Sequence, residues 1–332
     1  MNIQAIRAAL CVVGVVLASQ AHSAELTLPK DGWASWQVAA VEGAPDWCCW
    51  SSGDDRDASP ASCKLDEHSG NFGSRDHKTT DSVRVYARLA GGKVERLRVL
   101  SASCQVDAKT PIQEIGGVTA DDSARWFATL TNGGDGKDDH FRENLLAGLA
   151  MHRSEFAQSA LTEIARGNGS FETRKKAVFW LAMVRGIPGA EVVSSVMFND
   201  KDPDMRQHAS FAMAQSKSPR VAQDLIRLGN TDKDGEVRAQ AWFWLAQTGA
   251  SESEAAIAAA LKKDQDDHVR EKAIFALSQL PDERATRALV AVAEDRSLSH
   301  EQRKRAVFWL AQSESAGAQK YLEKVLAGNV SK

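Results

Sequence analysis

Four cysteines carry the most reactive side chains of this sequence. Two are adjacent in Trp47-Cys48-Cys49-Trp50, and the others are Cys63 and Cys104. Adjacent cysteines bond to each other only through a strained ring, so we expect each to reach a different one of the two distant cysteines. This leaves two connectivities, both of which would staple a small domain with two disulfides.

A metal or redox centre is the alternative use of these cysteines. Thiolates could bind zinc together with His68 and His77, and a strained vicinal disulfide could exchange with a partner. The sequence has no Cys-x-x-Cys pair, and its spacing matches no common zinc pattern. Because we expect export to an oxidising compartment, we favour structural disulfides and expect neither a metal nor a cofactor.

One motif outside this region resembles an ion site. Residues 230–235 read Asn-x-Asp-x-Asp-Gly, like the first half of a calcium loop, but Ala241 stands where such a loop needs a bidentate glutamate. No Gly-x-Ser-x-Gly, His-Glu-x-x-His or phosphate-binding loop occurs. We therefore expect no catalytic residue, and we interpret His152, His208 and His268 as surface or boundary residues.

Residues 1–24 are typical of a signal peptide. A positive residue, Arg7, precedes an apolar stretch over 8–18 that is too short to span a bilayer comfortably. We predict cleavage after Ala21 or Ala24, and an uncleaved anchor is the alternative. The mature chain would then be exported, to the periplasm or to the medium, without an integral membrane segment. A net charge of −3 gives no reason to expect nucleic acid as a partner.

Residues 25–130 are expected to form a small α+β module. Alternating and β-branched residues predict strands at 33–41, 82–89 and 94–100, the last two joined as a hairpin. The Ser-, Gly- and Asp-rich residues 51–81 predict a long loop. A helix should begin after Thr119, its N-cap, and run to residue 130. So small a core would profit from disulfides.

Residues 131–332 contain one stretch that returns about every 32 residues. Its clearest copy, at 174–182, reads Arg-Lys-Lys-Ala-Val-Phe-Trp-Leu-Ala. The repeated residues are Arg142, Arg174, Arg206, Arg238, Arg270 and Arg303, with Phe179, Phe211, Phe243, Phe275 and Phe308. Such a period predicts about six stacked helical hairpins, an all-α right-handed solenoid behind the disulfide-stapled module.

Each repeat should hold a first helix with this stretch and a second helix after a short loop. The expected second helices are 190–198, 221–228, 254–263, 283–293 and 318–327, and residues 186–189 are an expected loop. We interpret the Phe and Trp residues as core between repeats rather than as a binding ridge. The arginines should pair with aspartates of their own or the adjoining repeat.

The repeats resemble HEAT repeats, in particular the short PBS-lyase HEAT-like type. Residues 234–241 and 266–273 both fit Asp-x-x-Val-Arg-x-x-Ala. The layout of signal, cysteine module and repeats resembles exported bacterial HEAT-repeat proteins. Deoxyhypusine hydroxylase, an enzyme with such repeats, needs paired His-Glu motifs for two irons, whereas this array has only His300-Glu301. A bilin lyase offers no distinctive motif to compare.

The resemblance therefore implies a non-catalytic scaffold that binds a protein partner through the solenoid. The alternative is a metal- or redox-active cysteine module, an enzyme or sensor, that uses the solenoid as its recognition platform.

Overall fold

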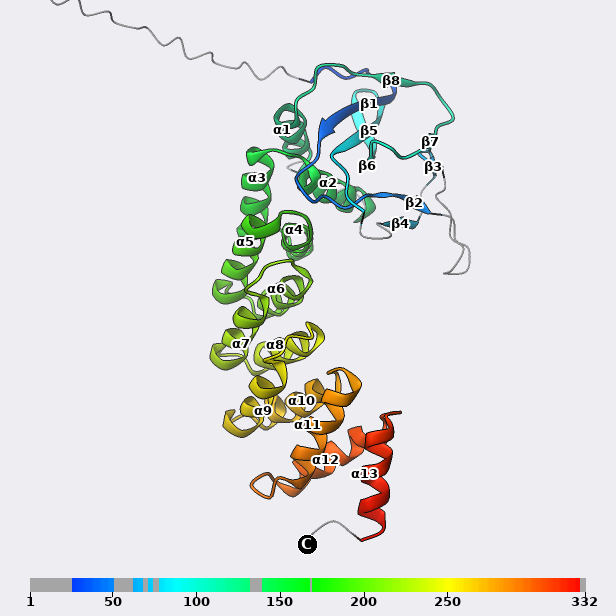
Figure 1. Cartoon of the computed structure of the whole chain (residues 1–332). Helices are drawn as coiled ribbons and strands as arrows, with labels where there is room; N and C mark the ends of the chain where they lie inside the picture. Colours follow the sequence, from blue (N-terminus) through cyan, green and yellow to red (C-terminus); the bar gives the residue numbers. More distant parts are fainter. Residues whose placement is uncertain are drawn as a thin grey trace, which may run out of the picture.

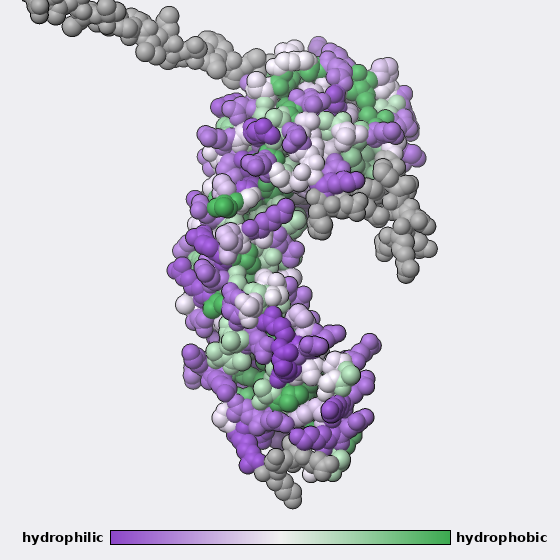
Figure 2. Space-filling view, viewed as in Figure 1, coloured by the Kyte–Doolittle hydropathy of each residue, from purple (hydrophilic) through white to green (hydrophobic). Residues whose placement is uncertain are grey.

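The computed structural model describes residues 26–50, 62–67, 71–73, 78–131, 139–167 and 169–328. The predicted signal peptide and both His68 and His77 lie outside these residues. A sheet-containing module lies at one end of a curved, two-layered array of helices (Figure 1). Figure 2 shows that the array and the module together form a C-shaped body with one hollow side.

The module is built on a four-stranded sheet with the order β6-β5-β1-β8. Its strands are β1 (Gly32–Ala39), β5 (Ser82–Ala90), β6 (Lys93–Ser101) and β8 (Ile112–Glu114). β5 and β6 form the predicted antiparallel hairpin, and β1 pairs antiparallel with β5 and parallel with β8. Every second residue of β5 from Val83 to Leu89 is buried, and of the residues between them only Tyr86 is also buried, which explains why this hairpin could be predicted.

Two further small sheets hold the cysteines. In one, β2 (Cys48–Trp50) pairs with β4 (Asn71–Gly73), and in the other β3 (Cys63–Lys64) pairs with β7 (Val106–Asp107). The prediction of an uninterrupted loop over 51–81 was wrong, since β3 and β4 lie within it. Strands of two or three residues are too short to show an alternating pattern.

Two disulfides connect these sheets, Cys48–Cys104 and Cys49–Cys63, with Cα–Cα distances of 5.6 and 5.3 Å. Successive side chains of a strand point to opposite faces, so the adjacent cysteines of β2 meet different partners. Cys49 and Cys63 are buried in a small core with Trp33, Tyr86 and Leu100. All four cysteines of the module are thus oxidised, as predicted.

Thirteen helices follow in the described part of the chain. The first, α1 (Ala120–Thr131), belongs to the module, and Thr119 Oγ1 caps it by accepting from the Asp122 N–H at 3.1 Å. The first helices of the six repeats are α2 (Asp139–Met151), α4 (Phe171–Val184), α6 (Pro203–Gln215), α8 (Gly235–Gln247), α10 (Asp267–Ser278) and α12 (His300–Ala311). The second helices are α3 (Glu155–Arg166), α5 (Gly186–Asn199), α7 (Val221–Thr231), α9 (Ser253–Lys263), α11 (Asp282–Glu294) and α13 (Ala316–Leu326).

The two kinds of helix form two layers. In Figure 1, α2, α4, α6, α8 and α10 lie on the hollow side, and α3, α5, α7 and α9 lie on the opposite, convex side. We call these the inner and outer layers. Two details differ from the expectation. Residue 155 starts a second helix, α3, that was not predicted, and residues 186–189 form the first turn of α5 instead of a loop. A proline in the first turn does not break a helix, so Pro188 is compatible with α5.

One hydrophobic core runs from the sheet through all six repeats. Gly148 of α2 marks the closest approach between module and array. A Cβ atom at this position would lie 2.5 Å from Val99 Cγ2 and 2.6 Å from the ring of Phe127, so only glycine fits. The module therefore covers the apolar end of the first repeat, which a solenoid would otherwise expose.

His152 lies at this junction and is fully buried, so its prediction as a surface or boundary residue was wrong. Its Nδ1 lies 2.6 Å from the Gly148 carbonyl oxygen and its Nε2 lies 2.7 Å from Ser123 Oγ. Ser123 Oγ accepts from Trp36 Nε1 at 2.7 Å, so its own proton is directed at His152 Nε2. The ring is thus held neutral, with its proton on Nδ1.

Acid should weaken the fold through this residue. Burial, reinforced by the nearby Arg185 charge and opposed by the Gly148 carbonyl, lowers the pKa of His152 from 6.5 to about 4. The unfolded chain therefore takes up this proton first as the pH falls, and stability is lost between pH 6.5 and pH 4. From pH 7 to pH 4.5 we expect the free energy of unfolding to fall by about 2.5 kcal/mol from this group.

Urea unfolding at both pH values, followed by circular dichroism, measures this loss. His152→Gln should remove most of the difference between pH 7 and pH 4.5, whereas His300→Gln, at an exposed histidine, should keep it. An unchanged pH dependence in His152→Gln would contradict the assignment.

Candidate functional site on the concave face

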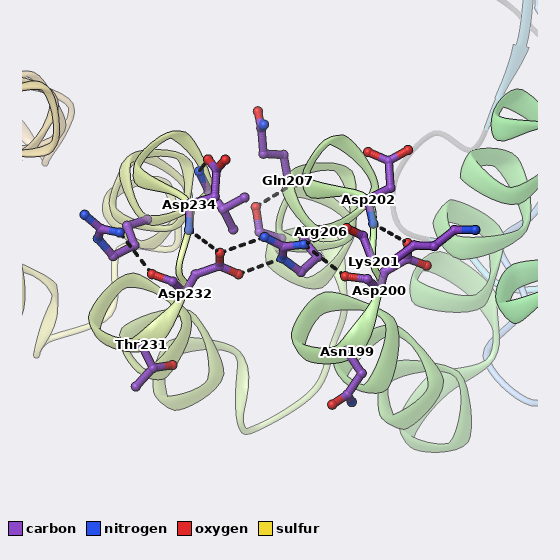
Figure 3. A network of polar contacts seen from close by, with 12 residues as sticks. Asn199, Asp200, Lys201, Asp202, Arg206, Gln207, Thr231, Asp232 and Asp234 are labelled. Carbon is purple, nitrogen blue, oxygen red and sulfur yellow. Dashed lines mark hydrogen bonds and ion pairs between the residues drawn. The ribbon is translucent and has the colours of Figure 1, made fainter.

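A ladder of ion pairs between arginines and aspartates runs through the middle of the array, and Figure 3 shows one of these pairs, Arg206–Asp232. Arg206 donates from Nε and Nη2 to the two carboxylate oxygens of Asp232, both at 2.8 Å. Arg238 binds Asp264 in the same way at 2.8 and 3.0 Å, and Arg174 binds Asp200. In all three pairs the aspartate lies 26 residues after the arginine, at the C-cap of the second helix of the same repeat.

The same aspartates also close the turn before the next inner helix. Asp232 Oδ1 accepts from the Asp234 N–H at 2.9 Å, and the Asp232 carbonyl accepts from Arg238 at 3.0 Å. Asp234 in turn caps α8 through the Glu236 N–H. Burial opposes ionisation of Asp232, but the hydrogen bonds from Arg206 and Asp234 outweigh it and lower its pKa. The calcium-like residues 230–235 thus serve an ion pair and a helix cap.

The ladder of arginine–aspartate ion pairs does not extend to the ends of the array. Position 296, where the pattern would place the acceptor for Arg270, is an arginine, and Arg270 binds Asp267 and the Asp264 carbonyl instead. At the other end Arg142 pairs locally with Asp139, and in the last repeat Arg303 donates to the Leu298 carbonyl. The repeated arginines therefore have a structural role in the array, and the concave face is formed by other residues.

The repeated phenylalanines lie on that face and not in the core. None of the five is fully buried, and Phe308 is 47% exposed. The residue two positions later is buried in every copy: Leu181, Met213, Leu245, Leu277 and Leu310. Positions two apart on a helix are about 200° apart around its axis. Each phenylalanine therefore faces away from the outer layer, toward the hollow side of the array.

The rings form an unbroken ladder across the repeats. Phe179 and Phe211 stack at 6.1 Å between centroids and 9° between planes, and Phe243 and Phe275 stack at 5.8 Å and 6°. Edge-on or tilted contacts of 4.8 to 5.6 Å join the remaining rings. In order, the ladder contains Trp47, Trp180, Phe179, Phe211, Trp244, Phe243, Phe275, Trp309 and Phe308.

The ladder has a period of two repeats. Tryptophan follows the phenylalanine in alternate copies, and Trp244 and Trp309 contact the phenylalanine of the repeat before, Phe211 and Phe275. The first repeat has Ala147 in the phenylalanine position, and there Trp47 of the module supplies the ring that contacts Trp180. The module and the array thus contribute to one continuous surface.

Polar side chains flank the ladder. Three residues before each phenylalanine stand Lys176, His208, Gln240, Lys272 and Arg305. Two ion pairs, Lys176–Glu143 at 2.7 Å and Arg305–Glu271 at 2.5 Å, and a hydrogen bond between His268 and Glu236 at 2.6 Å join neighbouring repeats on this face. Flat apolar rings beside donors and acceptors suit the binding of a polypeptide.

The other described residues that could form a catalytic or metal site are bonded or buried within the fold. The four cysteines are disulfide-bonded, so the described part of the module offers no thiolate. Ser123 and His152 lie within hydrogen-bond distance, but both are fully buried, out of reach of a substrate. Over the described ranges, no group of three His, Cys, Asp or Glu residues could hold a metal ion. Within the same ranges, every helix is too short or too polar to cross a membrane.

The comparison with protein families gives one match, HEAT repeats, at residues 158–241 and 229–306. No curated protein matches the chain. The structure of human deoxyhypusine hydroxylase in complex with glycerol is 15% identical and has a TM-score of 0.30. The similarity covers 59% of this chain and 85% of the hydroxylase chain. The CpcE–CpcF complex of phycocyanin lyase from Nostoc sp. PCC7120 is 17% identical, with coverages of 61% and 79% and a TM-score of 0.32. A computationally designed self-assembling cyclic homo-oligomer is 18% identical, with coverages of 64% and 73% and a TM-score of 0.14.

Proposed function

We propose that this protein is an exported, non-catalytic scaffold that binds a protein partner along its concave face. The proposal starts from the match of residues 158–241 and 229–306 to HEAT repeats. The observation that carries the proposal is the aromatic ladder from Trp47 to Phe308. Its rings pack against one another, and all of them except the buried Trp180 leave part of their surface exposed.

The energetics of aromatic side chains support a binding role for this ladder. Phe and Trp bury a large area at little cost in conformational entropy, and they dominate the binding free energy of many interfaces. A long row of partly exposed aromatic rings is an aggregation hazard unless a partner covers it. The rings also make edge or stacking contacts with the next repeat, which holds them in place before a partner binds.

Export is supported by the cysteines and by the first 24 residues. Two disulfides in a small sheet are typical of proteins that fold in an oxidising compartment, for which we propose the periplasm. The same disulfides speak against a metal- or redox-active module, because they leave none of the four module cysteines as a thiolate.

Chemical crosslinking in cells, followed by mass spectrometry, tests this function. A lysine-reactive reagent should join the partner to Lys272 and Lys304, which lie beside the ladder on α10 and α12. The matched control is Lys263 on the outer helix α9. We expect adducts at least tenfold more abundant at the two inner lysines than at Lys263. Adducts confined to the outer layer, or a chain that crosslinks to nothing, would overturn the proposal.

The double substitution Phe243→Ser and Phe275→Ser should remove these adducts. Both side chains are half-buried, so the fold should persist with a modest loss of stability. Circular dichroism of the purified variant checks that the helices remain. If the doubly substituted protein is folded and still crosslinks as the wild type does, the ladder is not the binding surface.

A further inference from the structure

We propose that a pocket beside the stacked rings of Phe243 and Phe275 receives a single apolar side chain from an extended, acidic segment of the partner. This inference rests on the proposed function and specifies which partner segment the concave face selects. The pocket has a volume of about 200 Å³ and is lined by Glu236, Ala239, Gln240, Phe243, Lys272 and Phe275.

The pocket exists because the fourth repeat departs from the others at one position. The residue four before the phenylalanine is Lys175, Gln207, Glu271 or Lys304 in the other copies with a phenylalanine, and Ala239 here. The long side chains would occupy the space beside the ring, whereas the alanine leaves it open. The stacked pair Phe179–Phe211 has the same arrangement as Phe243–Phe275, but Lys175 stands where Ala239 stands.

The size of the pocket determines what can enter. Sites for small organic ligands usually measure about 300–1,000 Å³, so this pocket is too small for most of them. It suits one leucine, isoleucine, methionine or phenylalanine side chain, packed beside the two stacked rings and against the methyl group of Ala239. A few side chains buried in well-packed, desolvated pockets carry most of the binding energy of protein interfaces.

The charges around the pocket favour an acidic segment. The carboxylate of Glu236 is already hydrogen-bonded within the protein, to His268 Nε2 at 2.6 Å and to Gln240 Nε2 at 3.4 Å. Lys272, in contrast, has no carboxylate within 4 Å among the described residues. The row three residues before each phenylalanine, from Lys176 to Arg305, contains no carboxylate at all. An aspartate or glutamate next to the inserted side chain could therefore pair with Lys272.

The spacing of the repeats favours an extended conformation. Packed helices lie about 8–10 Å apart, and an extended chain advances about 3.3 Å per residue. Such a segment passes one repeat in about three residues. A segment of 12 residues would therefore span about four repeats. Its deepest contact would be at the pocket beside Ala239, in the fourth repeat of the array.

Phage-displayed random 12-residue peptides, selected on the full chain, test this inference. Selected sequences should share an apolar residue within two positions of Asp or Glu. Synthetic fluorescent copies should bind, by anisotropy, at least tenfold more weakly to Ala239→Gln, which places in the pocket the side chain that Gln207 provides in the third repeat. Lys272→Glu should weaken the binding of acidic peptides and strengthen the binding of basic peptides.

The controls separate this inference from the proposed function. Gln207→Ala alters the equivalent position of the neighbouring repeat and should leave peptide affinity within twofold of the wild type. Some peptides could fail to bind the double variant Phe243→Ser with Phe275→Ser and yet bind Ala239→Gln with normal affinity. This result would overturn the pocket but would leave the proposed scaffold function standing. Failure to select any peptide with the apolar–acidic pattern would also overturn the pocket. Peptides that instead occupy the larger cavity of about 900 Å³ between Leu28, Val94 and Trp126 of the module would contradict both.

Discussion

Replacing Asp232 by alanine is expected to lower the free energy of unfolding by about 3–5 kcal/mol, because it leaves Arg206 buried without its counter-charge. Arg206 is only 3% exposed, and both its Nε and Nη2 donate to this carboxylate at 2.8 Å. The substitution also removes the acceptor of the Asp234 N–H, which shapes the turn before α8. Urea unfolding at pH 7 measures the loss.

An exposed pair in the fifth repeat is the matched control. Asp267 pairs with Arg270, but its side chain is 93% exposed, so Asp267→Ala should cost less than about 1 kcal/mol. A double substitution, Arg206→Met with Asp232→Leu, should recover most of the stability lost in Asp232→Ala, because two apolar side chains can replace a buried ion pair. Equal losses in Asp232→Ala and Asp267→Ala would show that burial of the Arg206–Asp232 pair has no energetic consequence.

Removing the Cys48–Cys104 disulfide, by serine at both positions, should lower the free energy of unfolding of the module by about 4 kcal/mol. The bond closes a loop with a sequence separation of 56, and a crosslink of this length removes much of the conformational entropy of the unfolded chain. Next to Cys48, Trp47 begins the aromatic ladder through its contact with Trp180. The substitution should therefore also weaken binding at this end of the concave face.

The second disulfide provides an internal comparison. Cys49–Cys63 closes a loop with a sequence separation of only 14, for which the same relation gives about 3 kcal/mol. Unfolding in urea, with and without a reducing agent, should rank the two double-serine variants in this order. Free thiols in the native, unreduced protein, or two variants as stable as the wild type, would contradict the assigned disulfides.

Much of the fold could be predicted because its signals are periodic. The 32-residue repeat predicted the helical hairpins, and the alternation over residues 82–89 predicted the hairpin of the module. The helix α3 was missed because its repeat is the weakest copy, with Ala147 in the phenylalanine position. Residues 186–189 contain two glycines and a proline, a loop composition, yet they form the first turn of a helix.

The features that define the site depend on tertiary contacts. Nothing near His152 in the sequence indicates that it is hydrogen-bonded to Ser123, which accepts from Trp36. The connectivity of the cysteines depends on which strands pair with β2 and β3, and these strands are too short to be predicted. One signal for the concave face was available. Each phenylalanine precedes a core leucine or methionine by two positions, and this spacing places it on the opposite side of its helix.

The most direct test of the concave aromatic ladder as the binding surface is photocrosslinking in cells from a single position. A photoreactive phenylalanine analogue replaces Phe308, which is 47% exposed at the end of the ladder, or Ile187, which is 60% exposed on the outer-layer helix α5. We predict a discrete protein adduct from position 308, at least tenfold stronger than any adduct from position 187. An adduct of equal or greater yield from position 187, or none from position 308, would contradict the proposed binding surface.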